Sequence, residues 1–451
     1  MPSNQKSADL DKSILSTALP AMVNLAVVPV VSTIETMWIG RMGIALALAG
    51  QSAAKSAYLT SFFLVSFLPT MAAPLVASAV GSGNKKEAQE KICDTLFLCN
   101  VFGLFGTILL SCFPDLVLRL VLSPDAPAME YARPYLRYEA FCMIPALVSA
   151  TGFAAFRGML DTVTPLKISL ACHFLKMCLD PIMIFKTPIG FVGVVCSSML
   201  AESVAGMVNL RLLLKKGLAK VGLLFTPPKK KNLMPLLTGG VTMMARQIAI
   251  NIALVSTTRY AQGLDRTGIA AAAYGIVNQM YTIGFVAHVA MQGAAAALVP
   301  STLAKSGPTE ARRMGDRIYG WSVAAGSFLA ILQYLLLPYV IPAFTTLPEV
   351  QEAVKRPAQV ACLLHLVNGP RFAGEGILMG LKGFFDLTAV TIVGSAIMVG
   401  CLQTKLGTSL AGVFTANVIF CSYQTIALFL HYLYVGPLSS RRSEKTPEKI
   451  E

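Results

Sequence analysis

The chain has 451 residues, of which 55% are hydrophobic and 13% charged, and its mean hydropathy is +0.64. Soluble globular domains carry roughly 25% charged residues, so this composition excludes that class. The formal net charge of +14 does not indicate nucleic acid, because lysines and arginines gather in particular loops between apolar stretches. We therefore expect an integral membrane protein with no nucleic-acid partner.

Twelve apolar stretches follow one another along the chain, and each approaches or exceeds the length of about 20 residues that a spanning helix needs. The connections between them are short, so no sizeable soluble domain fits. This predicts an all-α integral membrane protein. The expected spans are 13–39, 51–80, 92–113, 134–156, 165–186, 189–214, 234–262, 267–298, 315–343, 352–380, 386–404 and 408–435.

The N-terminal stretch MPSNQKSADLDKSILST lacks the basic region, apolar core and cleavage site of a secretory signal, so we interpret the first span as a retained helix. Basic residues concentrate in the loops after even-numbered spans, as in KKGLAKVGLLFTPPKKK (215–231) after the sixth. The positive-inside rule then predicts that both termini face the cytoplasm, or the stroma of a plastid. Whether the membrane is the plasma membrane or that of an organelle stays open.

Cysteines and histidines show no grouping that indicates chemistry. Ten cysteines lie almost all inside apolar stretches without a CxxC pair, so neither a disulfide framework nor a metal site is expected. The four histidines (His173, His288, His365 and His431) fall in different spans and are expected to pack separately. The sequence contains no phosphate-binding loop and no HExxH motif. We expect no enzyme activity and no cofactor.

The two halves of the chain share a pattern. LVASAVGSGNKKEA (75–88) and LVPSTLAKSGPTEA (298–311) both begin Leu-Val-x-Ser, contain a Ser-Gly turn and end Glu-Ala, at an offset of 223 residues. FRGMLDTVTPL (156–166) matches LMGLKGFFDLT (378–388) more weakly, with Gly158 opposite Gly380. The repeat predicts two six-helix bundles related by a pseudo-twofold axis, an arrangement that transporters use.

The repeat also divides the chain into domains. We expect an N-terminal six-helix lobe at 1–214, a basic cytoplasmic linker at 215–232, a C-terminal lobe at 233–436 and a polar tail at 437–451. The polar stretch FRGMLDTVTPL is interpreted as a turn between helices. Asp161 would satisfy free backbone groups at a helix end, and Gly158 would permit close approach of another helix.

Longer stretches resemble a known family. YLRYEAFCMIPALVSATGFAAFRGMLDTVTPL (135–166), LPAMVNLAVVPVVSTIETMWIGRMG (19–43) and LDPIMIF (179–185) are similar to the multidrug and toxic compound extrusion (MATE) transporters. MMARQIAINIALVSTTRYAQG (243–263) and RFAGEGILMGLKGFFDLT (371–388) resemble the DinF-like branch, which includes plastid members. The resemblance implies a monomeric antiporter that expels organic small molecules, xenobiotics included, in exchange for H+ or Na+.

Ionisable residues deep in a span are costly unless paired or hydrated, so each is a functional candidate. By the resemblance, Glu35 and Asp180 take the places of acids that bind the coupling ion. Lys176 stands where the family has asparagine, and Glu202 stands near a usual threonine. We expect Glu35 to be buried beside Asp180 and Lys176 to pair with at least one acid. Whether Lys176 and Glu202 preserve or abolish ion coupling stays open.

The second half lacks the seventh-span glutamate of many family members and has Arg246 in that region. Glu375 matches a family acid, and Arg371 precedes it by one helical turn, so the two can pair. Three amides of the eighth span and one of the seventh complete the expected substrate cavity. Its candidate residues are Lys55, Arg246, Asn251, Asn278, Gln279, Gln292, Arg371 and Glu375.

The sign of charge in that cavity leads to two hypotheses. Lys55, Arg246 and Arg371 set against Glu375 predict surplus positive charge and an organic anion as substrate. In the second hypothesis, Glu375 neutralises Arg371, and Arg246 and Lys55 reach the membrane interface. The cavity is then neutral, and the protein is a general drug exporter. A lipid-linked flippase of the same superfamily and an integral membrane lipid-modifying enzyme are the alternatives to antiport.

Overall fold

A computed structural model describes residues 3–40, 42, 45–119, 122, 127–224, 226–265, 269–345 and 347–439. All regular structure within these ranges is helical, which confirms the predicted class. The α-helices are α1 (Ser3–Gly40), α2 (Ala45–Val65), α3 (Phe67–Gly81), α4 (Lys85–Cys112), α5 (Pro114–Leu118), α6 (Met129–Glu139), α7 (Met143–Gly158), α8 (Val163–Phe185), α9 (Gly193–Lys215), α10 (Val221–Leu224), α11 (Lys230–Gly263), α12 (Ile269–Phe344), α13 (Pro348–Gly380), α14 (Phe384–Leu402) and α15 (Leu410–Leu430). The short helices are η1 (Ala140–Cys142), η2 (Gly190–Val192), η3 (Lys405–Thr408) and the π-helix η4 (His431–Val435).

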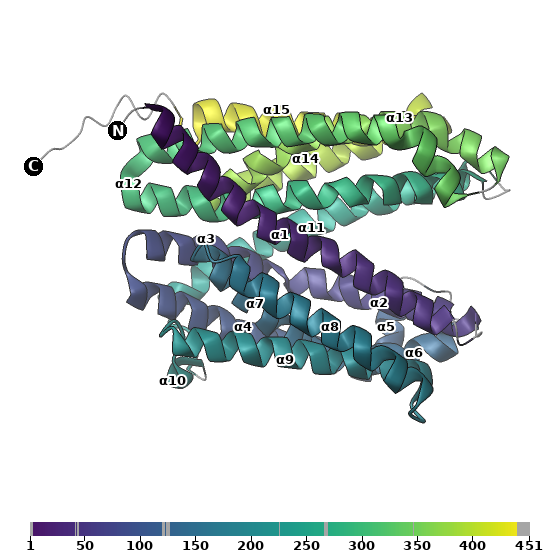
Figure 1. Cartoon of the computed structure of the whole chain (residues 1–451), viewed down its shortest axis with the longest axis horizontal. Coiled ribbons are helices and arrows are strands. Elements are labelled where there is room, and N and C mark those ends of the chain that lie inside the picture. Colours follow the sequence, from purple (N-terminus) through teal and green to yellow (C-terminus); the bar gives the residue numbers. More distant parts are fainter. Residues whose placement is uncertain are drawn as a thin grey trace, which may run out of the picture. The chain divides into compact units, whose positions relative to one another are not determined.

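The described part contains the twelve expected spans. Nine stretches of helix are long and apolar enough to cross a membrane. One of them, the 76-residue α12, is two helices that meet at Gly307, where the backbone has φ 84° and ψ 179° and the chain folds back on itself (Figure 1). Helices α11 and α13 add two more spans of 34 and 33 residues.

Prolines account for interruptions in the second and fourth spans. The second breaks between α2 and α3 at Ser66, and the fourth breaks at η1 between α6 and α7. A proline has no N–H for the carbonyl four residues earlier and clashes with it. Pro69 and Pro145 stand at that distance from Val65 and Phe141, so each break lies where a proline predicts it.

The helices form two compact units, and each is described by itself. The first unit is Val23–Gly240, and the second unit combines Met1–Met22 with Val241–Glu451. These boundaries follow packing, whereas the lobes expected from the sequence follow the repeat. The beginning of α1 belongs to the second unit, where Ile14 is buried in one apolar cluster with Leu298 and Ile377.

Neighbouring helices pack pairwise within each unit. In the first unit α8 packs on α9, α7 packs on α3 and α4, and α2 packs on α6. In the second unit α13 lies beside α12 and α15, and α15 also contacts α14 (Figure 1). Small residues permit the close approaches that stabilise helix pairs in membranes. A Cβ on Gly152 would lie 2.7 Å from the Cβ of Asn209, so α7 and α9 are too close there for any other residue.

Backbone geometry repeats at the offset found in the sequence. Helices α7 and α13 are each followed, two residues after their last residue, by one in the left-handed region: Leu160 with φ 61° and Lys382 with φ 63°, which lie 222 residues apart. In the first turn Asp161 N donates to Phe156 O, and in the second Gly383 N donates to Leu378 O, both at 2.9 Å. Such bonds satisfy free carbonyls at a helix C-terminus. The internal repeat is therefore present in the structure as well as in the sequence.

Asp161 caps helix α8 at the turn that follows α7. Its Oδ1 accepts from Thr164 N at 3.0 Å, and its Oδ2 accepts from Thr164 Oγ1 at 2.7 Å and from Lys216 Nζ at 2.9 Å. Burial raises the pKa of the Asp161 carboxyl, but the hydrogen bonds from Lys216 and Thr164 outweigh burial and hold the pKa below its ordinary range. A Cβ on Gly158 would lie 2.7 Å from Ala73 O, which confirms the predicted close approach.

We expect Asp161→Ala to lower the free energy of unfolding by about 1 kcal/mol, because the first turn of α8 loses its cap. Since the folded pKa of Asp161 is lowered, the ion pair stabilises the protein above the unfolded pKa and is lost as pH falls through the folded value. Thermal melting of the purified protein between pH 7 and pH 3 measures both effects.

Asp161→Asn is the matched control, because it keeps an oxygen for the Thr164 N–H and loses the charge. It should retain part of the stability and lose the acid-dependent part. An Asp161→Ala protein with the melting temperature of the wild type would contradict the assignment.

Candidate functional site

Four charged side chains from three helices meet in the first unit. Lys176 Nζ on α8 lies 2.9 Å from Glu35 Oε2 on α1 and 3.0 Å from Asp180 Oδ2 one turn along α8. Lys55 Nζ on α2 lies 2.6 Å from Glu35 Oε1. We call Glu35, Lys55, Lys176 and Asp180 the Lys176 cluster. With two carboxylates and two ammonium groups, it is neutral when all four are ionised.

Three members of the Lys176 cluster are buried, Lys55 is partly exposed, and polar neighbours complete the cluster. Glu35 is 2% exposed and Asp180 is fully buried. Gln51 Nε2 donates to Glu35 Oε1 at 2.9 Å, and Tyr135 OH donates to the same oxygen at 3.2 Å. The predicted pairing of Lys176 is confirmed with two acids, and Glu35 and Asp180 lie on the same ammonium group.

A cavity of about 400 Å³ lies beside the Lys176 cluster in the first unit. Cavities of this size bind small organic molecules. Its wall carries five ionisable side chains with formal charge and a larger number of apolar and aromatic ones. The five are Glu35, Lys55, Glu139, Lys176 and Glu202, and apolar neighbours include Val28, Leu59, Phe62 and Phe153. The mixture suits a molecule with an apolar body and a polar group.

Glu139, at the end of α6, is an acidic residue that sequence reasoning missed. It is 8% exposed, and its Oε2 is buried without a hydrogen-bond partner among the described residues. It ends the charged stretch MEYARPYLRYE and lies inside the expected fourth span, 134–156, but it was not named among the ionisable candidates. The buried positions Ala132, Tyr135, Leu136 and Glu139 follow helical spacing, which is the signal that could have found it.

Glu202, on α9, lines the same cavity and is half-buried. Across the ranges that the structure covers, neither Glu202 nor Glu139 takes part in an ion pair. The first unit therefore holds four carboxyl groups and two ammonium groups around one cavity. The coupling candidates named from the sequence were Glu35, Asp180, Glu202 and Lys176, and the structure adds Lys55 and Glu139 to this group.

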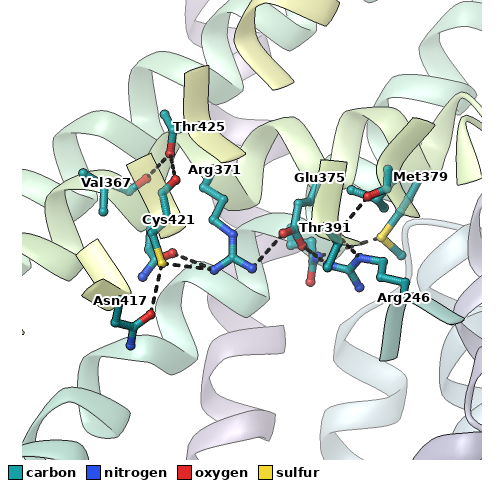
Figure 2. A network of polar contacts seen from close by, with 12 residues as sticks. Arg246, Val367, Arg371, Glu375, Met379, Thr391, Asn417, Cys421 and Thr425 are labelled. Atoms are coloured by element: carbon teal, nitrogen blue, oxygen red, sulfur yellow. Dashed lines mark hydrogen bonds and ion pairs between the residues drawn. The ribbon is translucent and has the colours of Figure 1, made fainter. Parts of the chain in front are cut away.

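A second cluster surrounds Glu375 in the second unit (Figure 2). Glu375 Oε2 lies 2.6 Å from Arg246 NH2 of α11, and Glu375 Oε1 lies 3.0 Å from Arg371 NH2. Gln292 Nε2 of α12 donates to Glu375 Oε2 at 2.7 Å. We call Arg246, Gln292, Arg371 and Glu375 the Glu375 cluster. Two guanidinium groups share one carboxylate, so the cluster has a net charge of +1.

Further contacts hold Arg371 in place. Its NH1 donates to Asn368 Oδ1 at 2.9 Å and approaches Cys421 Sγ at 3.6 Å (Figure 2). Its guanidinium carbon lies 4.9 Å from the ring centre of Phe372 and 5.3 Å from that of Phe420. Aromatic faces stabilise a buried cation in this geometry.

The geometry revises the two hypotheses about cavity charge. Arg371 pairs with Glu375 as expected, but Arg246 binds the same carboxylate and is buried, so the expectation that it reaches the interface is wrong. Lys55 was grouped with these arginines, yet it pairs with Glu35 in the first unit. The surplus positive charge of the second unit rests on the two arginines.

The four amides separate into one that joins the cluster and three that do not. Gln292 binds Glu375. Asn251 Nδ2 donates at 3.0 Å to Gln247 O within its own helix. The side chains of Asn278 and Gln279 are exposed. The sequence does not show which of these amides faces the interior of the unit, because α12 is apolar on all sides.

Two histidines meet in the second unit, contrary to expectation. His288 Nε2 lies 3.1 Å from His365 Nδ1, and His365 Nε2 lies 2.7 Å from Gln333 Oε1. Both rings are buried, and they lie 77 residues apart in the chain, so a sequence scan for neighbours could not join them. No group of three or more residues suited to a metal ion occurs among the described residues.

Twelve apolar helices in two units, each with a buried charged cluster, define a multi-pass membrane protein. The MatE family model matches residues 20–182. Protein DETOXIFICATION 44, chloroplastic, of Arabidopsis thaliana is 26% identical over 425 residues, covering 92% of this chain and 80% of that protein. DNA damage-inducible protein F of Escherichia coli (strain K12) is 23% identical over 381 residues, covering 82% of this chain and 80% of that one.

The fold agrees with these relatives. A crystal structure of MATE in the bent conformation has a TM-score of 0.87, with 18% identity and coverage of 97% of this chain and 98% of that chain. Through residues 20–182 and through these relatives, the chain is similar to the multidrug and toxic compound extrusion transporters. Its chloroplastic and DinF relatives are consistent with the DinF-like, plastid-type branch.

We expect Lys176→Met to destabilise the protein by about 3–5 kcal/mol, because it leaves Asp180 buried without a cation. Lys176→Met combined with Asp180→Asn should restore most of that stability, since no unpaired charge then remains at this position. Thermal melting of the purified proteins measures the difference.

Lys167→Met is the control, because Lys167 is exposed on the same helix. It should melt within a few degrees of the wild type. The ion pair would have no structural weight if the single Lys176 variant and the double variant were equally unstable.

Proposed function

We propose that the protein is a secondary active antiporter that exports organic solutes across a membrane in exchange for H+, with Na+ as the alternative coupling ion. The observation that carries the proposal is the cavity of the first unit, where groups that can bind a proton border a space for a small organic molecule. The half-chain repeat supports alternating access by two lobes, because transporters built on parallel repeats move in this way.

Lys176 favours H+ over Na+. Its ammonium group lies 2.9 Å from Glu35 and 3.0 Å from Asp180, so it occupies the space between the two acids that the family resemblance assigns to the coupling ion. A metal cation placed there would be repelled by the ammonium charge at low dielectric. A proton needs no such space, because it binds covalently to a single carboxylate oxygen.

The acidic lining argues against the flippase alternative. A flippase for lipid-linked anions would need a strongly cationic cavity, but three carboxyl groups and two ammonium groups line this one. An amphipathic solute with a neutral or cationic polar group is the better match. The Glu375 cluster, with its net charge of +1, supports an organic anion as the second candidate.

We place the protein in a plastid membrane as part of the same proposal. Two of its relatives carry the word chloroplastic in their names. Basic loops after the even-numbered spans put both termini on the cytoplasmic or stromal side. We propose that it acts as a monomer on small organic molecules within the lipid bilayer.

Flux measurements in proteoliposomes test the coupling. An imposed H+ gradient should drive uphill transport of organic solutes, and a Na+ gradient alone should not. Glu35→Gln should reduce the flux by about tenfold or more, because it removes an acceptor of Lys55 and Lys176 from the cavity wall.

Glu352→Gln is the control for this variant, because Glu352 is exposed on α13. Its flux should equal that of the wild type. Uphill flux driven by Na+ alone would contradict proton coupling, and absence of flux with every solute and gradient would contradict antiport.

Competition assays test the charge of the substrate. If the acidic cavity binds the solute, organic cations should inhibit flux more strongly than mono- or dicarboxylates. If the Glu375 cluster binds it, carboxylates should inhibit, and Arg246→Gln should weaken that inhibition by about tenfold, since one cation of the pair is lost. Strong inhibition by cations together with no effect of Arg246→Gln would exclude the anion.

A further inference from the structure

The four charges of the Lys176 cluster compensate one another within the cluster. Lys55 binds Glu35, and Lys176 binds both Glu35 and Asp180. Protonation of either acid would leave an ammonium group in a buried site with less compensation. Removing a partner from a buried pair is costly, so the geometry favours all four groups in their ionised forms. A cluster held in this way is poorly suited to releasing and taking up protons.

Glu139, unlike Glu35 and Asp180, has no cation paired with it among the described residues. Its carboxyl lines the cavity and is buried, yet neither ammonium group forms an ion pair with it, and its Oε2 has no hydrogen-bond partner in the described part of the chain. An uncompensated carboxylate at low dielectric is strongly disfavoured, whereas a neutral carboxylic acid is tolerated there. Water entering the cavity would remove much of this penalty.

Charged and titratable groups face Glu139 from the elements around it. Glu35 of α1 and Glu202 of α9 add negative charge, while Lys55 of α2 and Lys176 of α8 oppose it. The neutral neighbours are Tyr58 of α2, Tyr135 of α6 and Cys142 of η1. Two further helices contact α6: α5 carries Asp115, which pairs with Arg133 of α6, and α4 carries Thr107, which donates to Ala140 O. Since both ammonium groups are paired elsewhere, the net field at Glu139 is not strongly positive.

We propose that Glu139 carries the exchanged proton, and that Lys55 and Lys176 hold Glu35 and Asp180 as a fixed ion network. The proposal rests on the antiport function above and assigns its proton site to α6. With water in the cavity, Glu139 releases its proton to a water molecule. In that step the Glu139 O–H bond breaks and an O–H bond of a hydronium ion forms. In the reverse step a hydronium ion returns the proton to the carboxylate, and the neutral water that remains can leave.

Competition at Glu139 would couple the proton to the solute. A solute that carries a cationic group binds Glu139 strongly only after the proton has left, because the neutral carboxyl has no charge to offer it. A proton and a solute then occupy the site alternately. Antiport requires that the proton and the solute do not bind at the same time, and competition for Glu139 meets this requirement. The charges of the Lys176 cluster do not have to move.

Carbodiimide modification of the purified wild-type chain in nanodiscs tests the protonation state directly. Dicyclohexylcarbodiimide adds to a protonated carboxyl in an apolar site and gives an O-acylisourea, which rearranges to a stable N-acylurea without a leaving group. Peptide mass spectrometry at neutral pH should find the adduct on Glu139 and not on Glu35 or Asp180. The adduct should be absent in Glu139→Gln and persist in Glu130→Gln, whose changed residue is exposed on the same helix. Modification of Glu35 or Asp180, or an unmodified Glu139, would overturn the proposal.

Transport measurements supply the second readout. Glu139→Gln should lose at least about tenfold of its H+-driven uphill flux, and Glu139→Asp should restore coupling with a shifted pH profile. An unchanged H+-driven flux and pH profile in Glu139→Gln would overturn the proposal. If the wild type shows no H+-driven flux, the antiport function fails, whereas the carbodiimide result still decides whether Glu139 holds the proton.

Discussion

The structure of the first unit depends on one ammonium group. Lys176 lies between Glu35 and Asp180 at 2.9 and 3.0 Å, and all three side chains are buried. Each of these charges alone would be costly in that environment, and together they compensate one another. The ion pairs join α1 to α8, and Lys55 joins α2 to the same carboxylate. A cluster of charge therefore holds together helices whose apolar faces have no hydrophobic preference for one another over lipid.

The second unit also contains a buried cluster of charged side chains, but in this cluster positive charge is in excess. Glu375 is the single carboxylate, and Arg246 and Arg371 bind its two oxygens. Aromatic rings and a side-chain amide complete the surroundings of Arg371. The first unit thus has more acids than bases around its cavity, whereas the Glu375 cluster of the second unit has one positive charge in excess. Each sign of charge favours a different polar group of a solute, so one fold offers two chemically distinct clusters.

Much of the fold could be predicted because it depends on local sequence. Apolar length located the spans, and Pro69 and Pro145 stand where two of them break. The turn after α7 follows from Gly158 and Asp161, and its backbone recurs 222 residues later at Lys382. The charged clusters were harder to predict from the sequence. The pairing of Lys176 with Asp180 is local, since the two are four residues apart on one helix, but Glu139 was missed because it ends a charged stretch at the edge of a span.

The sequence by itself determined the helices, their turns, the half-chain repeat and the pairs within one helix, because the hydrogen bonds and contacts involved lie within a few residues of each other. Only the tertiary structure decided which distant groups meet. It joined Lys55 to Glu35, Arg246 to Glu375 and His288 to His365, over gaps that no short pattern records. These contacts depend on how helices are rotated and packed, and in an apolar bundle a helix that is hydrophobic on every side does not reveal which face is turned inward.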